Sequence, residues 1–305
     1  MNTYPGGVWP VMLTPFTQAG EIDEQGLRAL VDWYIRHGVS GLFAACQSSE
    51  IYEMSLAERV KITEITRAQA AGRVPVVASG HISDDLDSQV RELEAMAATG
   101  ADAVILITNH LAKADESNDV WKTNMERLLS RLDAGIHLGA YECPRPYKRL
   151  MSPDVISFIA QTGRFYFLKD TCCDAETIRQ KLSAAKGTSL KLYNANTTTL
   201  LESLLDGAAG FSGIMANFHP ELYVWLVQNP QHIKAQRVQD LLTLASLIER
   251  QLYPVNAKYH LKEIECLPVT TFARVQDDTL LTQTFRTEVE MMNRALNRMN
   301  EELLS

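Results

Sequence analysis

The sequence alternates between two kinds of segment from its N-terminus to about residue 230, and this alternation restricts the possible folds more than any other feature. Short runs rich in β-branched and aliphatic residues each precede a longer segment with apolar residues at helical spacing. Because strands that alternate with helices form parallel βα units, the pattern predicts an α/β fold. Eight runs predict strands, at residues 7–13, 41–45, 74–79, 103–107, 136–141, 165–169, 189–193 and 210–213.

The segments between these runs carry helix signals. Apolar residues that include Leu27 and Leu30 recur at three- and four-residue intervals, and Gly38 is placed to end that helix in a left-handed conformation. Ser55 and Glu58 form a capping-box pattern, which predicts that a second helix begins there.

The alternation stops after about Pro220, and residues 241–251 and 284–304 look helical. No Gly/Ser-rich or Pro-rich linker separates this part from the rest. We therefore expect a barrel at residues 1–225 and a C-terminal helical extension at 226–305 that packs on it.

Eight βα units fit either a closed (β/α)8 barrel or a doubly wound open sheet. A doubly wound nucleotide-binding fold normally has a glycine-rich turn after its first strand, but here residues 11–16 read VMLTPF. The sequence therefore favours the (β/α)8 TIM barrel.

Composition narrows the functional classes. Hydrophobic residues make up 46% of the 305 residues, which provides material for a large core. The net charge of −8 argues against nucleic acid and membrane surfaces as partners, and no apolar run approaches a membrane span. We expect a cytoplasmic protein.

The cysteines predict neither a disulfide framework nor a metal site. Their number is odd, their positions are scattered and no CxxC pair occurs, which is typical of reduced thiols. They are Cys46, Cys143, Cys172, Cys173 and Cys266.

Lys169 is the most informative polar residue, because it ends the apolar run Phe165–Leu168 and catalytic groups of a barrel lie where strands end. An apolar setting lowers the pKa of a lysine, and a neutral amine can attack a ketone to form a Schiff base. Tyr141 ends the preceding strand, where its hydroxyl could move protons. The alternatives are a Lys169 that extends to solvent at the rim and a Tyr141 that is a core aromatic.

With these positions, the chain resembles the N-acetylneuraminate lyase and dihydrodipicolinate synthase superfamily of Schiff-base aldolases. The resemblance extends over nearly the whole chain. Thr14-Pro15-Phe16 matches an opening segment of the family, and residues 46–50 are similar to its GTTGE turn. Residues 141–144 correspond to the family's YNxP segment and residues 168–170 to its (I/L)KD segment. Residues 210–213 with Asn217 resemble its glycine-rich last strand.

The resemblance implies roles for individual residues. Lys169 would form the imine, Tyr141 would relay protons, and Ser48 would orient Tyr141. The backbone amides of Gln47 and Ser48 would hold the substrate carboxylate, with Ser212 and Gly213 also at the substrate. It further implies a small 2-oxo acid substrate such as pyruvate, no metal or organic cofactor, and a homo-oligomer, either a dimer or a tetramer.

Several positions depart from the family pattern. Cys46, Gln47 and Ser49 replace a glycine, a threonine and a glycine of the turn, which puts its usual geometry in doubt. His110 stands near the tyrosines that the synthases carry after strand four, and is either a substitute or an ordinary loop residue.

Two further departures concern residues after strand five. The synthase arginine falls at Pro146 here, with Arg145 one position earlier. Glu142 replaces an asparagine, and is either a base near the tyrosine or paired with Arg145 or Lys148 at the rim.

The leading hypothesis is a lyase or aldolase that cleaves, or in reverse condenses, a 2-oxo-3-deoxy acid and releases pyruvate. Dihydrodipicolinate synthase (4-hydroxy-tetrahydrodipicolinate synthase) is an alternative that Pro146 and the missing tyrosine disfavour. A dehydratase that uses the same imine, a non-catalytic relative that binds 2-oxo acids, and a weakly supported phosphate-binding barrel enzyme are the others.

Overall fold

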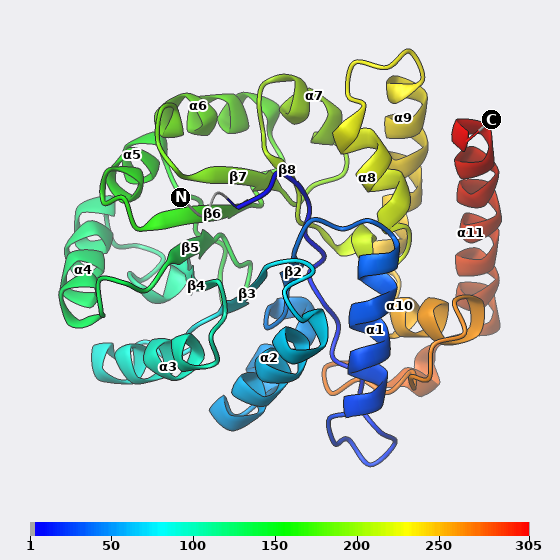
Figure 1. The fold of residues 1–305 in the computed structure, drawn as a ribbon, viewed down its shortest axis with the longest axis horizontal. Coiled ribbons are helices and arrows are strands. Elements are labelled where there is room, and N and C mark those ends of the chain that lie inside the picture. The colour runs from blue at the N-terminus through cyan, green and yellow to red at the C-terminus, as the bar shows by residue number, and fades with distance from the viewer. Residues whose placement is uncertain (1–3, 305) are drawn as a thin grey trace.

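The computed structural model describes residues 4–304, and these form a closed barrel of eight parallel strands (Figure 1). The strand order is β1-β8-β7-β6-β5-β4-β3-β2, and a parallel bridge between Val11 and Phe43 joins the segment after β1 to β2. The (β/α)8 fold expected from the sequence is therefore confirmed. The strands are β1 (Gly7–Val8), β2 (Leu42–Phe43), β3 (Val76–Ser79), β4 (Ala103–Ile107), β5 (Leu138–Tyr141), β6 (Phe165–Asp170), β7 (Lys191–Asn194) and β8 (Gly210–Phe211).

The first strand is shorter than expected because Pro10 interrupts its hydrogen bonding. Trp9 N–H still donates to Phe211, but Pro10 has no N–H, and its carbonyl accepts from Phe43 on the other side. The chain thus passes from one neighbour, β8, to the other, β2, within a few residues.

One helix follows each strand and lies outside the barrel (Figure 1). The two helix signals in the sequence are confirmed: Ser55 and Glu58 form the capping box, and Gly38 has a φ of +78° just after the first helix. The helices are α1 (Glu24–Arg36), α2 (Leu56–Ala70), α3 (Leu86–Ala98), α4 (Asn118–Arg131), α5 (Pro153–Gln161), α6 (Ala175–Ala185), α7 (Leu200–Leu205) and α8 (Pro220–Gln228).

Aromatic side chains fill the inside of the barrel below the ends of the strands. The rings of Phe167 and Tyr193 stack with centroids 4.4 Å apart, and Trp9 contacts both edge-on. Gly41 permits this packing, since a Cβ there would lie 2.3 Å from the Trp9 ring. The barrel is therefore a packed core, and Lys169, two residues after Phe167, points to the same inner side one layer higher.

The C-terminal part packs against one side of the barrel, where α11 contacts α8 and α9 (Figure 1). Its helices are α9 (Ala235–Ala245), α10 (Val255–Tyr259) and α11 (Gln283–Leu304). The helix expected at 284–304 is confirmed, whereas residues 241–251 divide between the end of α9 and a 3-10 segment, η5 (Ser246–Arg250). A division at residue 225 stays a prediction, and that residue lies within α8. Within residues 4–304, helices are too short or too polar to cross a membrane.

Candidate active site

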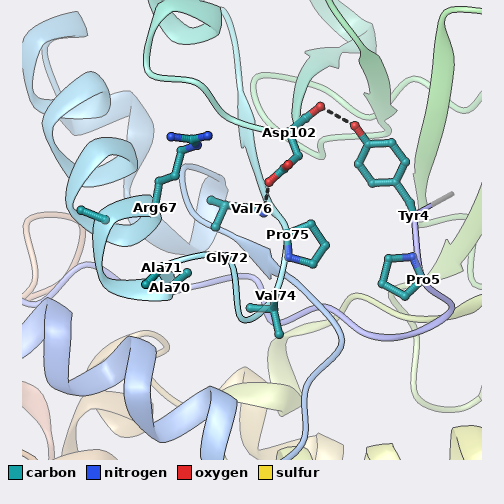
Figure 2. A pocket seen from close by; sticks show the side chains of 11 residues that line it. Tyr4, Pro5, Arg67, Ala70, Ala71, Gly72, Val74, Pro75, Val76 and Asp102 are labelled. Atoms are coloured by element: carbon teal, nitrogen blue, oxygen red, sulfur yellow. Dashed lines mark hydrogen bonds between the residues drawn. The ribbon is translucent and has the colours of Figure 1, made fainter. Parts of the chain in front are cut away.

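Two cavities lie at opposite ends of the barrel. The larger, about 680 Å³, is formed at the amino ends of β3 and β4 by residues that include Tyr4, Arg67 and Asp102 (Figure 2). Its Asp102 carboxylate is used within the fold, since it accepts from Val76 N–H at 2.8 Å. In barrels of this kind chemistry takes place at the carboxyl ends of the strands, so this cavity is not the candidate site.

The second cavity, of about 370 Å³, opens at the carboxyl ends of the strands and contains Lys169. Its walls come from the turn after β2, the ends of β5 and β6, the segments after β7 and β8, and the C-terminal part. The lining residues are Gln47, Ser48, Glu50, Tyr141, Pro144, Arg145, Lys148, Lys169, Thr171, Cys173, Ala195, Asn196, Gly213, Ile214, Glu249, Tyr253, Pro254, Val275 and Gln276.

Lys169 differs from the other buried lysines in having no carboxylate partner. Three lysines are buried in the described part of the chain, and Lys181 and Lys258 each form an ion pair with a buried carboxylate. The amine of Lys169 has no carboxylate within ion-pair distance among residues 4–304, and burial lowers its pKa. A lysine in this setting is a neutral nucleophile for a larger share of the time than an exposed one.

Tyr141 lies next to Lys169, as the sequence predicts for residues that end adjacent strands. The two residues are register partners of β5 and β6, and the Lys169 amine lies 4.2 Å from the centroid of the Tyr141 ring. Burial raises the pKa of Tyr141 well above its ordinary value, so the phenol stays protonated at neutral pH. It can therefore donate a proton beside the amine.

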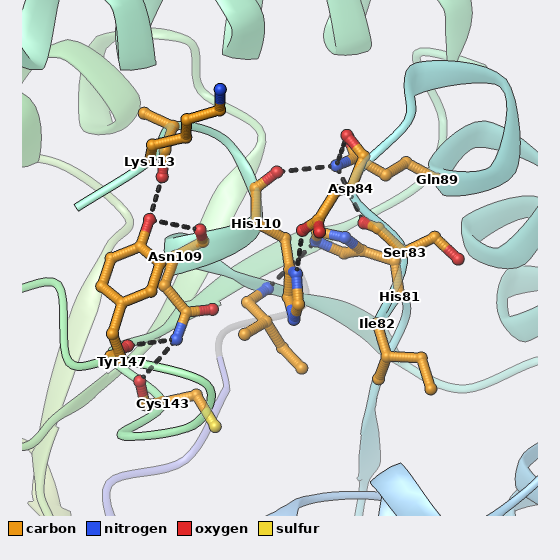
Figure 3. A network of polar contacts seen from close by, with 12 residues as sticks. His81, Ile82, Ser83, Asp84, Gln89, Asn109, His110, Lys113, Cys143 and Tyr147 are labelled. Atoms are coloured by element: carbon orange, nitrogen blue, oxygen red, sulfur yellow. Dashed lines mark hydrogen bonds and ion pairs between the residues drawn. The ribbon is translucent and has the colours of Figure 1, made fainter. Parts of the chain in front are cut away.

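A chain of polar groups connects the Tyr141 phenol to the protein surface. The phenol is hydrogen bonded to the Cys143 thiol, whose sulfur lies 3.6 Å from Tyr52 Oη. Tyr52 Oη in turn lies 3.4 Å from His110 Nε2. His110 Nδ1 lies 2.7 Å from Asp84 Oδ1 (Figure 3). The Asp84 side chain is 87% exposed, so the chain ends in solvent.

His110 therefore lies outside the cavity wall but within reach of it through Tyr52. Asn109, its neighbour, fixes the loop after β5 by donating to the carbonyl oxygen of Cys143 at 2.9 Å (Figure 3). It also donates to the carbonyl oxygen of Arg145 at 2.8 Å. The sequence contains no local signal for Tyr52, which lies in a short 3-10 segment after the turn.

The turn after β2 does not need the glycines that it lacks. Cys46 is extended, with φ −146°, and Ser49 lies inside a 3-10 helix, η1 (Gln47–Ser49). The left-handed residue is Glu50, with φ +67°. The Ser49 hydroxyl ties the turn to the barrel through the carbonyl oxygens of Met12 and Ala44, both at 2.6 Å. The three replaced positions therefore need no glycine, and whether the turn keeps the usual family geometry stays a prediction.

Glu50 connects this turn to the C-terminal part of the chain. Its carboxylate accepts from Lys258 Nζ at 2.7 Å and from the backbone N–H groups of Arg274 and Val275 at 2.6 and 3.0 Å. Lys258 is 1% exposed, so the ion pair is shielded from water. We infer that these contacts hold the left-handed conformation of Glu50 in place.

Ser48 has a partner that the sequence does not suggest. Its hydroxyl is hydrogen bonded to the phenol of Tyr253, which also accepts from Asn217 Nδ2 at 3.1 Å. The Ser48 amide contacts the Cys46 thiol, a group that a glycine at this position would not provide. The expected orientation of Tyr141 by Ser48, and the carboxylate-binding role of the Gln47 and Ser48 amides, stay predictions.

Glu142 points away from the cavity, and the expected rim ion pair with Arg145 or Lys148 is wrong. Strand residues alternate in direction, so an inward Tyr141 places Glu142 outside the barrel wall. There its carboxylate, 0% exposed, lies 2.5 Å from Lys181 Nζ, which also contacts Asp170 at 2.5 Å. Glu142 is thus part of a buried ionic cluster beneath α6.

The remaining expected residues lie at different depths. Arg145 is at the cavity mouth, with its guanidinium 5.5 Å from the centroid of the Tyr52 ring. Gly213 lines the wall, where a Cβ would lie 2.4 Å from the Ala195 carbonyl oxygen. Ser212 is fully buried and is not a lining residue.

Glu249 and Tyr253 are cavity residues that the sequence pattern misses. Both follow the last βα unit, so neither ends a strand. Burial raises the pKa of the Glu249 carboxyl to about 7, and the nearby Lys169 charge opposes this rise. Among residues 4–304, His, Cys, Asp and Glu side chains do not gather into a metal-binding group.

Comparison with known proteins gives consistent results. The model of the dihydrodipicolinate synthetase family matches residues 4–279. A 4-hydroxy-tetrahydrodipicolinate synthase of Methanospirillum hungatei is 24% identical over 74% of this chain and 76% of its own. The probable 2-dehydro-3-deoxy-D-pentonate aldolase YjhH of Escherichia coli is 27% identical over 87% and 89%. The crystal structure of E. coli YagE in complex with pyruvate superposes with a TM-score of 0.84 at 20% identity, over 96% and 98% of the two chains.

Proposed function

The chain belongs to the dihydrodipicolinate synthetase family, and on that basis we propose that it is a Schiff-base-forming lyase or aldolase that acts on pyruvate or a 2-oxo-3-deoxy acid through Lys169. The observation that carries the proposal is the buried Lys169 amine without a carboxylate partner among residues 4–304, at the floor of a cavity and beside a protonated phenol. A charged structural lysine would need a partner at this depth.

The proposed mechanism begins with attack of the neutral Lys169 amine on the 2-oxo group. Tyr141 donates a proton to the oxygen that leaves as water, and a protonated imine remains. When the bond between carbons 3 and 4 breaks, the hydroxyl on carbon 4 gives up its proton to a base in the cavity and becomes the carbonyl of the released aldehyde. The electron pair of the broken bond moves into the imine and forms an enamine. A proton then converts the enamine to the imine of pyruvate, which water hydrolyses.

The route through Cys143, Tyr52 and His110 supports this role of Tyr141. A phenol that gives up a proton in each cycle must recover it, and Asp84 at the far end of the route is exposed to water. We propose that the substrate carboxylate lies at the Gln47–Ser49 turn, facing Lys169 across the cavity.

A synthase is the second candidate, because relatives such as that of M. hungatei carry this name. The name of YjhH and the pyruvate bound to YagE are equally compatible with an aldolase. Pro146 stands where the synthases have an arginine for their second substrate, which favours the aldolase. A non-catalytic protein that binds 2-oxo acids is the third.

Reduction with borohydride in the presence of pyruvate tests the proposal. We expect a stable covalent adduct on the peptide that contains Lys169, detected by mass spectrometry. Failure to trap any adduct would favour the non-catalytic binder. Release of pyruvate from a panel of 2-oxo-3-deoxy acids, compared with condensation of pyruvate and aspartate semialdehyde, then separates the aldolase from the synthase.

Replacing Tyr141 by phenylalanine should slow imine formation about 100-fold or more, because it removes a proton donor at the reacting carbon. The measurement is the rate of adduct formation with pyruvate under borohydride. Tyr166→Phe is the matched control, since Tyr166 starts the same strand as Lys169 but lies at the other end of the barrel, with its ring near His137. An equal effect of both substitutions would contradict the role of Tyr141.

We also propose that the protein is a homo-oligomer, either a dimer or a tetramer, and that it is located in the cytoplasm. Exposed apolar side chains of the C-terminal part, Leu244, Leu247 and Met291, support association. Sedimentation velocity of the purified protein measures the oligomeric state.

A further inference from the structure

Glu142 stands where the family pattern has an asparagine, and its charge has no role in the steps proposed for Lys169 and Tyr141. Its carboxylate belongs to a buried cluster with Asp170 and Lys181 on the outer side of β5 and β6. The strand residues that precede the two carboxylates are Tyr141 and Lys169, which face the cavity. Because strand residues alternate in direction, the cluster lies directly behind this pair, on the other side of the barrel wall.

The contacts of Glu142 favour its charged form. Oε1 accepts from Met151 N–H at 2.7 Å and from Lys181 Nζ at 2.5 Å, and Oε2 accepts from Thr171 N–H at 2.9 Å. A proton on either oxygen would point toward another donor, so these contacts stabilise the carboxylate. Burial and the neighbouring Asp170 charge raise the pKa of Glu142, and Lys181 and the Thr171 amide oppose this rise.

Asp170 is also surrounded by donors. Its Oδ1 accepts from Cys172 N–H at 3.0 Å, and its Oδ2 accepts from Lys181 Nζ at 2.5 Å. The Cys172 thiol interacts with the cluster too, but burial raises its pKa to about 12, so the thiol adds no charge. Two carboxylates therefore share one ammonium group, and one negative charge remains in excess among side chains that are shielded from water.

The excess charge lies close to Lys169 along the backbone. Asp170 is the next residue, and Glu142 N–H donates to the Lys169 carbonyl oxygen at 3.3 Å. Burial lowers the pKa of Lys169, and the Asp170 charge acts in the opposite direction. The cluster therefore opposes the effect of burial on the amine.

The groups on the cavity side of the amine supply little fixed charge. Burial raises the pKa values of the Cys46 and Cys143 thiols and of the Tyr141 and Tyr253 phenols, so these groups are uncharged at neutral pH. Burial raises the pKa of Glu249 to about 7, so its charge varies around neutral pH. Two further charges, at the exposed mouth of the cavity and therefore screened by water, belong to Arg145 and Lys148.

We propose that Glu142 is a positioning residue for charge: with Asp170 and Lys181 it supplies a negative charge that acts on the Lys169 nitrogen through the barrel wall and sets the pH range in which the amine reacts. Because both carboxylates point away from the cavity, neither pairs with the ammonium group and blocks it. The same charge favours a cation on this nitrogen, such as a protonated imine. This second effect rests on the proposed function of Lys169, whereas the first concerns the amine alone.

Acetylation with acetic anhydride over a range of pH tests the proposal, because only a neutral amine reacts and no substrate is needed. Glu142→Gln removes one negative charge and leaves Asp170 paired with Lys181, so the ammonium form of Lys169 becomes less stable. The midpoint for acetylation should move to lower pH by about one unit, and Lys169 should react about 10-fold faster below the midpoint. Mass spectrometry of the Lys169 peptide, relative to an added amine standard, measures the rate.

A triple variant separates the charge from local packing. Glu142→Gln combined with Asp170→Asn and Lys181→Met has the same net charge in this region as Glu142→Gln alone, so its midpoint should shift in the same direction. Glu176→Gln removes an exposed carboxylate from α6 and is the matched control, which should keep the wild-type midpoint. Circular dichroism shows which variants are folded.

Each other outcome has a definite meaning. A midpoint that stays at the wild-type pH or rises in a folded Glu142→Gln or triple variant overturns the proposal, and so does an equal shift in Glu176→Gln. Exchange of the pyruvate methyl hydrogens in D₂O is measured alongside. A wild type without exchange contradicts the proposed function of Lys169, and the acetylation result still decides the role of Glu142.

Discussion

Replacing Lys169 by arginine should abolish the borohydride adduct with pyruvate and lower the rate of pyruvate hydrogen exchange by about 10⁴-fold or more, as for loss of other covalent nucleophiles. Arginine retains the positive charge and most of the length of lysine, but its guanidinium does not become a neutral nucleophile in a protein. Comparing Lys169→Arg with the wild type therefore separates the effect of losing the nucleophile from the effect of losing the positive charge. Mass spectrometry measures the adduct, and NMR in D₂O measures the exchange.

Lys148→Met is the matched control for this substitution. Lys148 lines the mouth of the same cavity but is exposed, so its removal should leave the adduct on Lys169 intact. Circular dichroism and thermal unfolding of Lys169→Arg and Lys169→Ala show whether each variant is folded. An adduct that persists on another lysine in a folded Lys169→Arg protein would contradict the assignment.

Replacing Lys181 by methionine should lower the free energy of unfolding by about 3–5 kcal/mol, because it leaves two buried carboxylates without their cation. Lys181 Nζ lies 2.5 Å from both Glu142 and Asp170, and all three side chains are 0% exposed or nearly so. Urea unfolding followed by circular dichroism measures the change.

A triple variant distinguishes the loss of an ion pair from the loss of packing. Combining Lys181→Met with Glu142→Gln and Asp170→Asn removes all the charges while retaining oxygens for backbone N–H donors such as Thr171 and Cys172. We expect the triple variant to be more stable than Lys181→Met alone. A triple variant that is less stable than the single one would show that packing, and not uncompensated charge, dominates.

The fold was predictable because it depends on a pattern repeated along the chain. Eight alternations of strand and helix signals, without a glycine-rich turn after the first strand, favoured a parallel barrel, and adjacent strand ends then placed Lys169 beside Tyr141. The same period of two could also have indicated that Glu142 faces outward, since Tyr141 before it faces inward. Comparison with the family motif, which has an asparagine there, suggested a role for the Glu142 charge in the cavity or at its rim. The carboxylate instead forms an ion pair with Lys181.

Other parts of the cavity could not be read from local sequence. Glu249 and Tyr253 come from a region without regular alternation, and only tertiary packing brings them to the barrel mouth. Tyr52 reaches Cys143 through a loop whose course no short-range pattern determines. The missing glycines of the turn were misleading for a different reason, because the left-handed backbone conformation falls on Glu50.

Glu50 is held by Lys258 and by the backbone N–H of Arg274, both from the C-terminal part. The βα units therefore do not form the entrance of the cavity without the C-terminal part. The C-terminal part that contributes Glu249 also carries Lys258 and Arg274, which fix the turn after β2. If two relatives exchanged their C-terminal segments, cavity-lining side chains and the support of the turn after β2 would be transferred together. Selectivity would then be inherited with about a quarter of the chain, while the eight strands beneath stayed the same.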